Sequence, residues 1–254
     1  MDIRADAARF YDADPGHPND VPFYISQVSG GNLHVLELGC GTGRVLLPLS
    51  KACARIHGVD LSDAMTTICR QKLDAAGIPS TRASVSVGDI SDFSLADRFD
   101  LIIAPFRVLQ NLETDRQLDG LFRCIATHLS KRGTCVLNVF NPYAPPDVII
   151  REWVSAEEQL EWEIAYGDGT LRRYCRNTRL SPDPLVLYPD LIYRLYKGTT
   201  IVEEAVLSIA MRCYYPDQFM SLVSEHGFEV IGQWGGYEGE AYGTGPELVI
   251  RFRR

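Results

Sequence analysis

The stretch His34-Val35-Leu36-Glu37-Leu38-Gly39-Cys40-Gly41-Thr42-Gly43-Arg44 decides the fold of this chain. Its apolar residues at 35, 36 and 38 predict a short strand that is covered on both faces. The three glycines let the backbone adopt conformations that other residues avoid and approach a ligand closely. A helix is expected from about Gly43 to Lys51, and its first free N–H groups favour negative charge at the turn. Together these parts predict a nucleotide-type pocket.

The spacing of the glycines restricts which nucleotide fits. A dinucleotide-binding turn has the pattern G-x-G-x-x-G, in which the third glycine permits close packing of the helix on the strand. Counted from Gly39, that third position is held by Arg44, whose side chain does not fit the same contact. The pattern here is E-x-G-x-G-x-G, which disfavours NAD as the ligand.

Acidic residues follow two later apolar segments. Residues 55–60 and 85–90 each have the pattern of a strand that leads into an acid, Asp60 or Asp89, and residues 99–104 form another apolar strand. An acid at a strand's carboxyl end, about 20 residues beyond the glycines, can hold both ribose hydroxyls. Ser62 is the expected N-cap of the helix that follows Asp60. Three strand ends therefore bring polar groups to one sheet edge, where open α/β sheets bind ligands.

Four segments in this order carry a family resemblance. The glycine pattern, GVDLSDAM at 58–65, VGDI at 87–90 and FDLIIAPF at 99–106 resemble the motifs of class I S-adenosylmethionine (SAM)-dependent methyltransferases. FYD at 10–12 and D-VPFY at 20–24 resemble the N-terminal cap of small-molecule methyltransferases of the methyltransferase domain 25 type. The resemblance covers residues 1–140 and resumes near Tyr214. It implies an α/β, Rossmann-like, seven-stranded, mostly parallel sheet whose last strand is antiparallel, with later strands at 134–140, 228–231 and 247–252.

The resemblance implies SAM as the cofactor and S-adenosylhomocysteine as the product. It assigns the three glycines to the methionine portion, Asp60 to the ribose, and Asp89 with Ile90 to the adenine. Glu37 is an acidic neighbour that orients the amides of the loop. The cofactor-binding residues that the resemblance implies are Tyr11, Tyr24, Glu37, Gly39, Cys40, Gly41, Thr42, Gly43, Arg44, Asp60, Leu61, Met65, Gly88, Asp89, Ile90, Ala104, Pro105 and Phe106.

The N-terminal segment has two interpretations. Residues 1–13 predict an amphipathic helix with Ile3, Ala7, Phe10 and Tyr11 near one face, and a second helix begins near Val21. In the family such a cap places an aromatic residue near the cofactor. Tyr11 and Tyr24 are therefore either site-closing residues or ordinary helix-packing aromatics.

Residues 141–210 differ in pattern from the rest. Polar residues alternate with aromatic or β-branched ones at 160–164, 174–178, 191–196 and 201–203, which predicts half-buried antiparallel strands. Turn signals at 167–169, 181–184 and 197–199 separate them. We expect an inserted antiparallel sheet of three or four strands, with residues 1–140 and 211–254 forming the cofactor-binding core. The insertion is either a lid over the active site or an element of assembly, for example in a homodimer.

The expected chemistry is methyl transfer to nitrogen or oxygen of a small molecule. Such an in-line displacement asks the protein mainly to position the acceptor and exclude water. An amine acceptor needs only to be unprotonated, whereas a hydroxyl usually needs a general base. Many relatives carry histidine at the position of Asn111, so no histidine base is expected there. Catalytic candidates are Arg107 and Gln110, with surface or capping roles as alternatives, and His17 as a base on a loop.

Composition narrows the remaining classes of function. The formal charge of −8 argues against a dedicated nucleic-acid binder. Neither a secretory leader nor a run of about 18 apolar residues is seen, so we expect no membrane partner and a cytoplasmic location. The seven cysteines lack a C-x-x-C and the five histidines lack metal-ligand spacing, so no metal site is expected. Two alternatives stay open: a tRNA or protein methyltransferase, and a non-catalytic SAM-binding module. The sequence does not identify the methyl acceptor.

Overall fold

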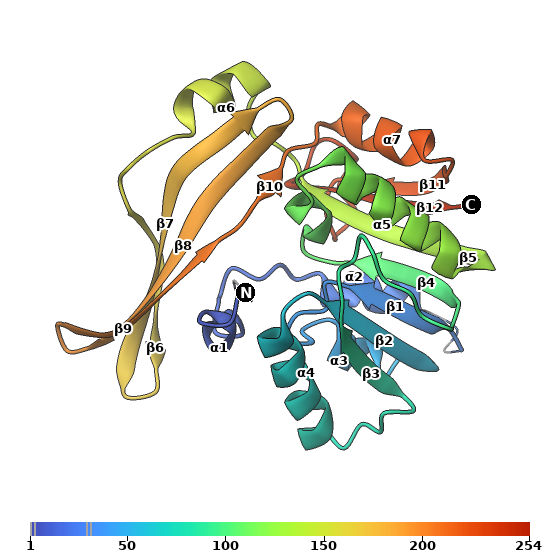
Figure 1. The fold of residues 1–254 in the computed structure, drawn as a ribbon, viewed down its shortest axis with the longest axis horizontal. Helices are drawn as coiled ribbons and strands as arrows, with labels where there is room; N and C mark the ends of the chain where they lie inside the picture. The colour runs from blue at the N-terminus through green and yellow to red at the C-terminus, as the bar shows by residue number, and fades with distance from the viewer. Residues whose placement is uncertain (1, 3, 29, 31) are drawn as a thin grey trace.

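The computed structural model describes residues 2, 4–28, 30 and 32–254, which form two sheets (Figure 1). The larger sheet has seven strands in the order β11-β12-β5-β4-β1-β2-β3. All neighbours pair in parallel except β12, which runs antiparallel to both β5 and β11. The predicted seven-stranded sheet with an antiparallel last strand is confirmed. The bounds are β1 His34–Leu38, β2 Arg55–Asp60, β3 Ala83–Val87, β4 Phe99–Ala104, β5 Leu129–Phe140, β11 Glu229–Trp234 and β12 Glu247–Arg253.

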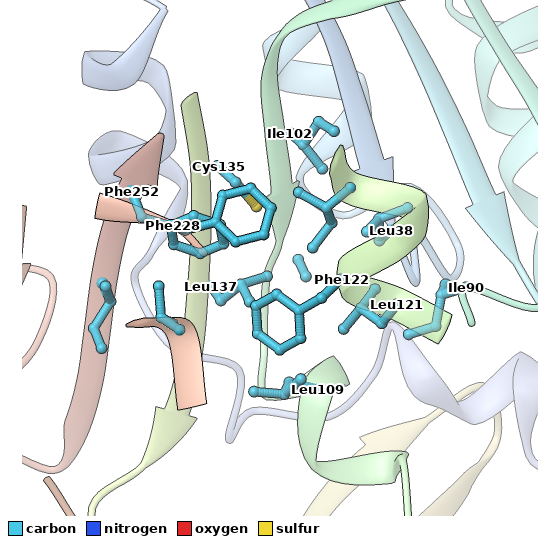
Figure 2. Close-up of a cluster of buried hydrophobic side chains, with 14 of the residues drawn as sticks. Leu38, Ile90, Ile102, Leu109, Leu121, Phe122, Cys135, Leu137, Phe228 and Phe252 are labelled. Carbon is cyan, nitrogen blue, oxygen red and sulfur yellow. The ribbon is translucent and has the colours of Figure 1, made fainter. Parts of the chain in front are cut away.

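Helices cover both faces of this sheet. On one face, α5 (Asp115–His128) and α7 (Pro216–Glu225) pack against alternating strand residues such as Leu38 and Leu137, and Figure 2 shows this cluster around Phe122. On the other face, α2 (Val21–Gln27), α3 (Leu46–Leu49) and α4 (Asp63–Ala75) pack against residues such as Val35. Because the strands are buried on both sides, their apolar runs are continuous. Because helices cover both faces, only the loops at the strand ends can form a binding site.

The second sheet is antiparallel and contains five strands. Its order is β10-β8-β7-β6, and β9 pairs with the same edge of β8 as β10, farther along that strand. The three predicted turns all join neighbouring strands, and residues 141–210 contain four strands, within the expected three or four. The fifth strand, β10, has only two residues and lies just beyond the expected end of the insertion. A short helix, α6 (Pro146–Glu152), precedes the sheet and was not predicted. The bounds are β6 Gln159–Tyr166, β7 Gly169–Pro182, β8 Leu185–Lys197, β9 Thr200–Ser208 and β10 Met211–Arg212.

The N-terminal segment lies between the two sheets. The expected helix over residues 1–13 is much shorter, because α1 comprises only Ala8–Tyr11, and Ile3 lies outside the described residues. Phe10 of α1 is 1% exposed and packs on the second sheet, with ring centroids 5.6 Å from Tyr166 and 5.8 Å from Tyr193. The segment thereby connects the second sheet to the core (Figure 1).

The helix after the glycine turn is also shorter than expected. It was predicted from Gly43 to Lys51, but α3 contains only Leu46–Leu49. Pro48 has no N–H to donate to the carbonyl of Arg44, so the hydrogen-bond ladder is interrupted between Leu47 and Leu49. The helix start, which the sequence suggested would favour negative charge at the turn, therefore does so less strongly than expected.

No described helix combines the length and the apolar content that a bilayer-spanning segment requires.

Candidate functional site

The glycine turn lies between β1 and α3 at the carboxyl edge of the large sheet. Gly39 has φ of +67°, and its N–H donates to the Val59 carbonyl at 2.7 Å. A Cβ at Gly39 would lie 2.5 Å from the side chain of Val108, so only glycine permits this approach. Gly41 has φ of +53° and nothing within 4 Å of a Cβ position. The middle of the turn therefore offers open backbone to a ligand.

Asp60 at the end of β2 holds the turn in place. Its Oδ2 accepts from the N–H of Gly41 at 2.8 Å, and its Oδ1 accepts from the N–H of Ser62 at 2.9 Å. Ser62 caps α4 as predicted, since its Oγ accepts from the N–H of Met65 at 3.2 Å. Each carboxylate oxygen keeps a second lone pair, which suits the two hydroxyls of a ribose. Asp60 is thus both a structural and a ligand-binding candidate.

The ends of β2 and β3 present apolar surface beside this carboxylate. Leu61 is 60% exposed and Val87 is 47% exposed, whereas Met65 and Ile90 are buried. Two exposed aliphatic side chains on neighbouring strand ends suit the faces of a flat base such as adenine. Val87 is absent from the predicted set.

The candidate adenine acid lies in the turn after β3. Gly88 is half-buried, and its N–H donates to the Asp60 carbonyl at 2.9 Å. Asp89 is exposed, and its Oδ1 accepts from both the N–H and the Oγ of Ser91, at 2.8 and 2.7 Å. Its Oδ2 has no hydrogen-bond partner among the described residues, so it stays available to a ligand.

A buried ion pair closes the other side of the glycine turn. Arg44 donates to both carboxylate oxygens of Asp20, at 2.5 and 2.8 Å, and the Asp20 side chain is fully buried. Burial alone would lower the pKa of Arg44, but the hydrogen-bonded Asp20 carboxylate raises it above its usual range. Thr42, also fully buried, donates to Asp12 at 2.6 Å. Neither aspartate was predicted, because they lie 24 and 30 residues from their partners.

One buried polar atom of β1 and one of the glycine turn itself lack hydrogen-bond partners among the described residues. They are Oε2 of Glu37 and Nε of Arg44, one an acceptor and the other a donor. Burial raises the pKa of Glu37 well above its usual value. Buried groups without partners are uncommon and need an explanation. An ammonium group for Glu37 and a carboxylate for Arg44 satisfy both, and an α-amino acid carries that pair of charges.

The two predicted tyrosines differ in their surroundings. Tyr24 is fully buried against Phe23 and Tyr237, which supports the helix-packing interpretation. Tyr11 lies against the imidazole of His17, with ring centroids 4.7 Å apart, and burial raises its pKa to about 12. Tyr11 therefore lies near the site and remains neutral at physiological pH.

The end of β4 has a strained backbone. Ala104 and Pro105 are buried, and the next two residues, Phe106 and Arg107, have φ of 56° and 66°, which is rare outside glycine. Such strain persists only where surrounding contacts fix it, and it concentrates at functional sites. The turn thus presents the Phe106 ring toward the glycine turn, where the Arg44 guanidinium lies 5.5 Å from its centroid.

A network from β5 and β12 fixes that turn. Asn138 accepts from the N–H of Arg107 at 3.1 Å and donates to Glu247 at 2.9 Å, and Glu247 accepts from the Arg107 guanidinium at 3.0 and 2.5 Å. Asn138 and Glu247 are buried polar residues within apolar strands, a signal that the sequence analysis missed. Arg107 therefore stabilises the turn after β4 through Asn138 and Glu247, and it is also a candidate to contact the methyl acceptor.

Gln110 has a structural position. It is fully buried in the 3₁₀ turn Val108–Asn111, donates to the Arg212 carbonyl at 2.7 Å, and accepts from the Phe140 N–H at 2.8 Å. Its amide bonds to the backbone through both its nitrogen and its oxygen, which favours a structural role over a catalytic one. Cys40 is 3% exposed and is one of seven free cysteines. Within the described ranges, no three His, Cys, Asp or Glu residues cluster as a metal site would require.

Replacing Asp60 by alanine tests the ribose contact. The change removes hydrogen bonds to a charged acceptor that are worth about 1.5–3 kcal/mol, so SAM should bind roughly tenfold to a hundredfold more weakly. Asp89→Ala is the matched control at the next strand end. It should be milder, because Asp89 is exposed and bonds only within its own turn. Calorimetry with S-adenosylhomocysteine checks both, and an unchanged dissociation constant in folded Asp60→Ala would move the ribose elsewhere.

Replacing Glu37 by glutamine should separate stability from binding. The raised pKa means that the native state binds a proton more tightly than the unfolded chain, so stability is lost as pH rises from 4.5 through the folded-state pKa. Glu37→Gln removes this buried ionisable group and should stabilise the ligand-free protein at pH 7 by about 1 kcal/mol or more. Affinity for SAM should nevertheless fall about tenfold. Thermal unfolding and calorimetry measure the two effects, and tighter binding of SAM by the variant would contradict the ammonium contact.

Comparison with known proteins agrees with this geometry. Residues 35–133 match the family model described as a methyltransferase domain. A dTDP-3-amino-3,6-dideoxy-alpha-D-glucopyranose N,N-dimethyltransferase from Streptomyces fradiae is 26% identical over 217 residues, which cover 83% of this chain and 76% of that protein. A dTDP-3-amino-3,4,6-trideoxy-alpha-D-glucopyranose N,N-dimethyltransferase from Streptomyces venezuelae is 29% identical over 123 residues. That second alignment spans 48% of this chain and 48% of the relative, about half the length of each.

Among solved structures, the chain resembles an amino pentose methyltransferase from Micromonospora echinaspora that was determined with SAM bound. The TM-score is 0.71 at 18% identity, and the match covers 98% of this chain and 96% of that one. The fold is therefore that of a Rossmann-like methyltransferase. The structural match covers the second sheet as well as the large one. Residues 35–133 are thus a methyltransferase domain, and the fold is that of solved SAM-dependent methyltransferases. The predicted methyltransferase type, with SAM as its cofactor, is confirmed.

Proposed function

We propose that this chain transfers methyl groups from SAM to the amino group of a nucleotide-linked amino sugar. The observation that carries the proposal is the alignment with the Streptomyces fradiae dimethyltransferase, which runs over 83% of the chain and so includes residues outside the matched methyltransferase domain. That relative is named for an aminosugar acceptor. A small acceptor also agrees with the formal charge of −8, which does not favour a polyanionic one.

The residues present fit the cofactor. The orphaned Oε2 of Glu37 and Nε of Arg44 complement the ammonium and carboxylate of its methionine portion. The free lone pairs of Asp60 suit the ribose hydroxyls, and the exposed Leu61 and Val87 suit the base. When bound, SAM supplies an electrophilic methyl group on a sulfonium. The chain's own task is to hold the acceptor nitrogen in line with it and exclude water.

We propose further that the second sheet is a lid over the acceptor. One face of the sheet, with Leu171, Tyr193 and Leu207, packs around α1 and so encloses the segment that leads into the site. The homodimer interpretation is the second candidate, since exposed apolar residues such as Leu160 lie elsewhere on the sheet. We place the protein in the cytoplasm, where reduced thiols such as its seven free cysteines are the rule.

An acceptor comparison tests the proposed function. The purified chain is incubated with SAM and either dTDP-3-amino-3,6-dideoxy-α-D-glucopyranose or the analogue with a 3-hydroxyl group. The rate at which methylated product forms is followed by mass spectrometry. The amine should be methylated at least roughly 100-fold faster, because a neutral hydroxyl is a poor nucleophile without a strong base. Faster methylation of the hydroxyl analogue would assign O-transfer instead. Binding of SAM without turnover of either sugar would favour a non-catalytic module.

A further inference from the structure

His17 lies in the strap of residues 12–20, which runs from α1 to α2 beside the glycine turn. Its Nε2 is 2.8 Å from the carbonyl oxygen of Tyr11. A carbonyl only accepts hydrogen bonds, so Nε2 must carry the proton and Nδ1 of the neutral ring must carry a lone pair. Nδ1 is buried and has no hydrogen-bond partner in the part of the chain that the structure describes. Nδ1 of His17 is thus a buried proton acceptor with no hydrogen-bond donor beside it among the described residues.

The walls around His17 belong to the site. The imidazole lies between two aromatic rings, with centroids 4.7 Å from Tyr11 and 5.5 Å from Phe106. Phe106 is the first residue of the strained turn after β4, and Arg44 of the glycine turn lies over the same ring. The lone pair therefore lies at the meeting point of the strap, the glycine turn and the end of β4.

Burial keeps the imidazole of His17 neutral. It lowers the pKa below the ordinary value of 6.5; the hydrogen bond to the Tyr11 carbonyl acts in the opposite direction, and the nearby Arg44 guanidinium lowers the pKa further. Asp12 and Asp14 of the strap act in the opposite direction, but Asp12 is paired with Lys72 at 2.5 Å and Asp14 with Arg173. Neither carboxylate hydrogen-bonds to the imidazole. The ring is consequently unprotonated at pH 7 and able to accept a proton.

We propose that Nδ1 of His17 is the base that takes a proton from the acceptor's ammonium group and so prepares the amine for methyl transfer. This inference rests on the proposed function. A sugar amine is mostly an ammonium at pH 7 and has no lone pair to react. The ammonium first passes one proton to Nδ1, and the imidazolium later returns that proton to solvent. The freed lone pair of the amine nitrogen then forms a bond to the methyl carbon while the carbon–sulfur bond breaks and its electron pair goes to sulfur, which becomes the thioether of S-adenosylhomocysteine; the product leaves as the N-methylammonium.

The test compares His17→Gln with the native protein at two pH values, using dTDP-3-amino-3,6-dideoxy-α-D-glucopyranose as the acceptor. Glutamine keeps a donor for the Tyr11 carbonyl but has no titratable nitrogen. We expect kcat to fall roughly 100-fold at pH 7, within the range for general-base removal, and less than about fivefold at pH 9.5, where the amine is already neutral. An equal loss at both pH values would assign His17 a purely structural role and overturn the proposal.

A spectroscopic readout makes the proposal independent of turnover. Nitrogen NMR of the ligand-free protein should show Nε2–H and an unprotonated Nδ1 at pH 7, and the opposite tautomer would overturn the proposal. His226→Gln is the matched control, because its ring bonds to Leu222 and Asp119 on the outer helices, and its kcat should stay native at both pH values. If the native protein binds S-adenosylhomocysteine but methylates no amine, the proposed function fails as well. If it methylates amines and His17→Gln does so equally well, only the role of His17 fails.

Discussion

Replacing Phe10 by alanine should lower methyl-transfer turnover roughly 100-fold while SAM binding weakens less than about tenfold. Phe10 is the buried side chain that seats α1 on the second sheet, between Tyr166 and Tyr193. Truncating a buried phenylalanine costs about 3–5 kcal/mol. The lost packing energy is that between α1 and the second sheet. The strap of residues 12–20, which carries His17, is then no longer held against the sheet, and water can enter the site.

The same variant separates the lid from the assembly interpretation. The matched control is Leu160→Ala, because Leu160 is 53% exposed on the same sheet and its truncation should leave turnover native if the sheet acts as a lid. Thermal unfolding verifies that the core is intact, and gel filtration reports the oligomeric state. Native turnover of Phe10→Ala would show that the docking of α1 on the sheet is not needed for catalysis. A change of oligomeric state in Leu160→Ala would favour the assembly role.

Replacing Arg44 by methionine should both destabilise the fold and abolish tight cofactor binding. The change leaves the fully buried carboxylate of Asp20 without a countercharge, which costs about 3–5 kcal/mol. For a chain of this size the unfolding midpoint should drop by about 10 °C. SAM affinity should fall roughly 100-fold, because the donor for the methionine carboxylate disappears with the guanidinium.

A double variant distinguishes the two effects of that change. Asp20→Leu combined with Arg44→Met removes the buried pair together and should recover most of the lost stability, since apolar replacement of a buried pair is often neutral. It should not recover cofactor affinity, because Arg44 is still absent. Calorimetry with S-adenosylhomocysteine and thermal unfolding measure both quantities. Native affinity in the double variant would show that Arg44 supports the fold alone.

Much of the core was predictable because its signals are local. The apolar run at 35–38, the acid at 60 and the glycines at 39–43 are each set by their own strand and turn, and the structure has β1, β2 and β4 near their expected bounds. The three hairpin turns of the second sheet were likewise fixed by local turn residues. Pro48 was a local signal too, and the helix around it was overestimated because the missing N–H at that position was not taken into account.

The contacts that complete the site were not predictable in this way. Asp20 meets Arg44 across 24 residues, Asn138 meets Glu247 across 109, and Arg107 meets Glu247 across 140. One sequence gives no measure of which distant polar residues pair, so Glu247 was simply the start of a strand. Gln110 shows the same limit from the other side. Its sequence position does not reveal that its amide bonds to backbone groups of β5 and β10.

The most direct test of the central claim is a crystal structure of the protein with S-adenosylhomocysteine. We expect the ammonium of the ligand at Oε2 of Glu37, its carboxylate at Nε of Arg44, its ribose hydroxyls at Asp60, and its base between Leu61 and Val87. A ligand bound away from the glycine turn, with Glu37 and Arg44 still unpartnered, would contradict it.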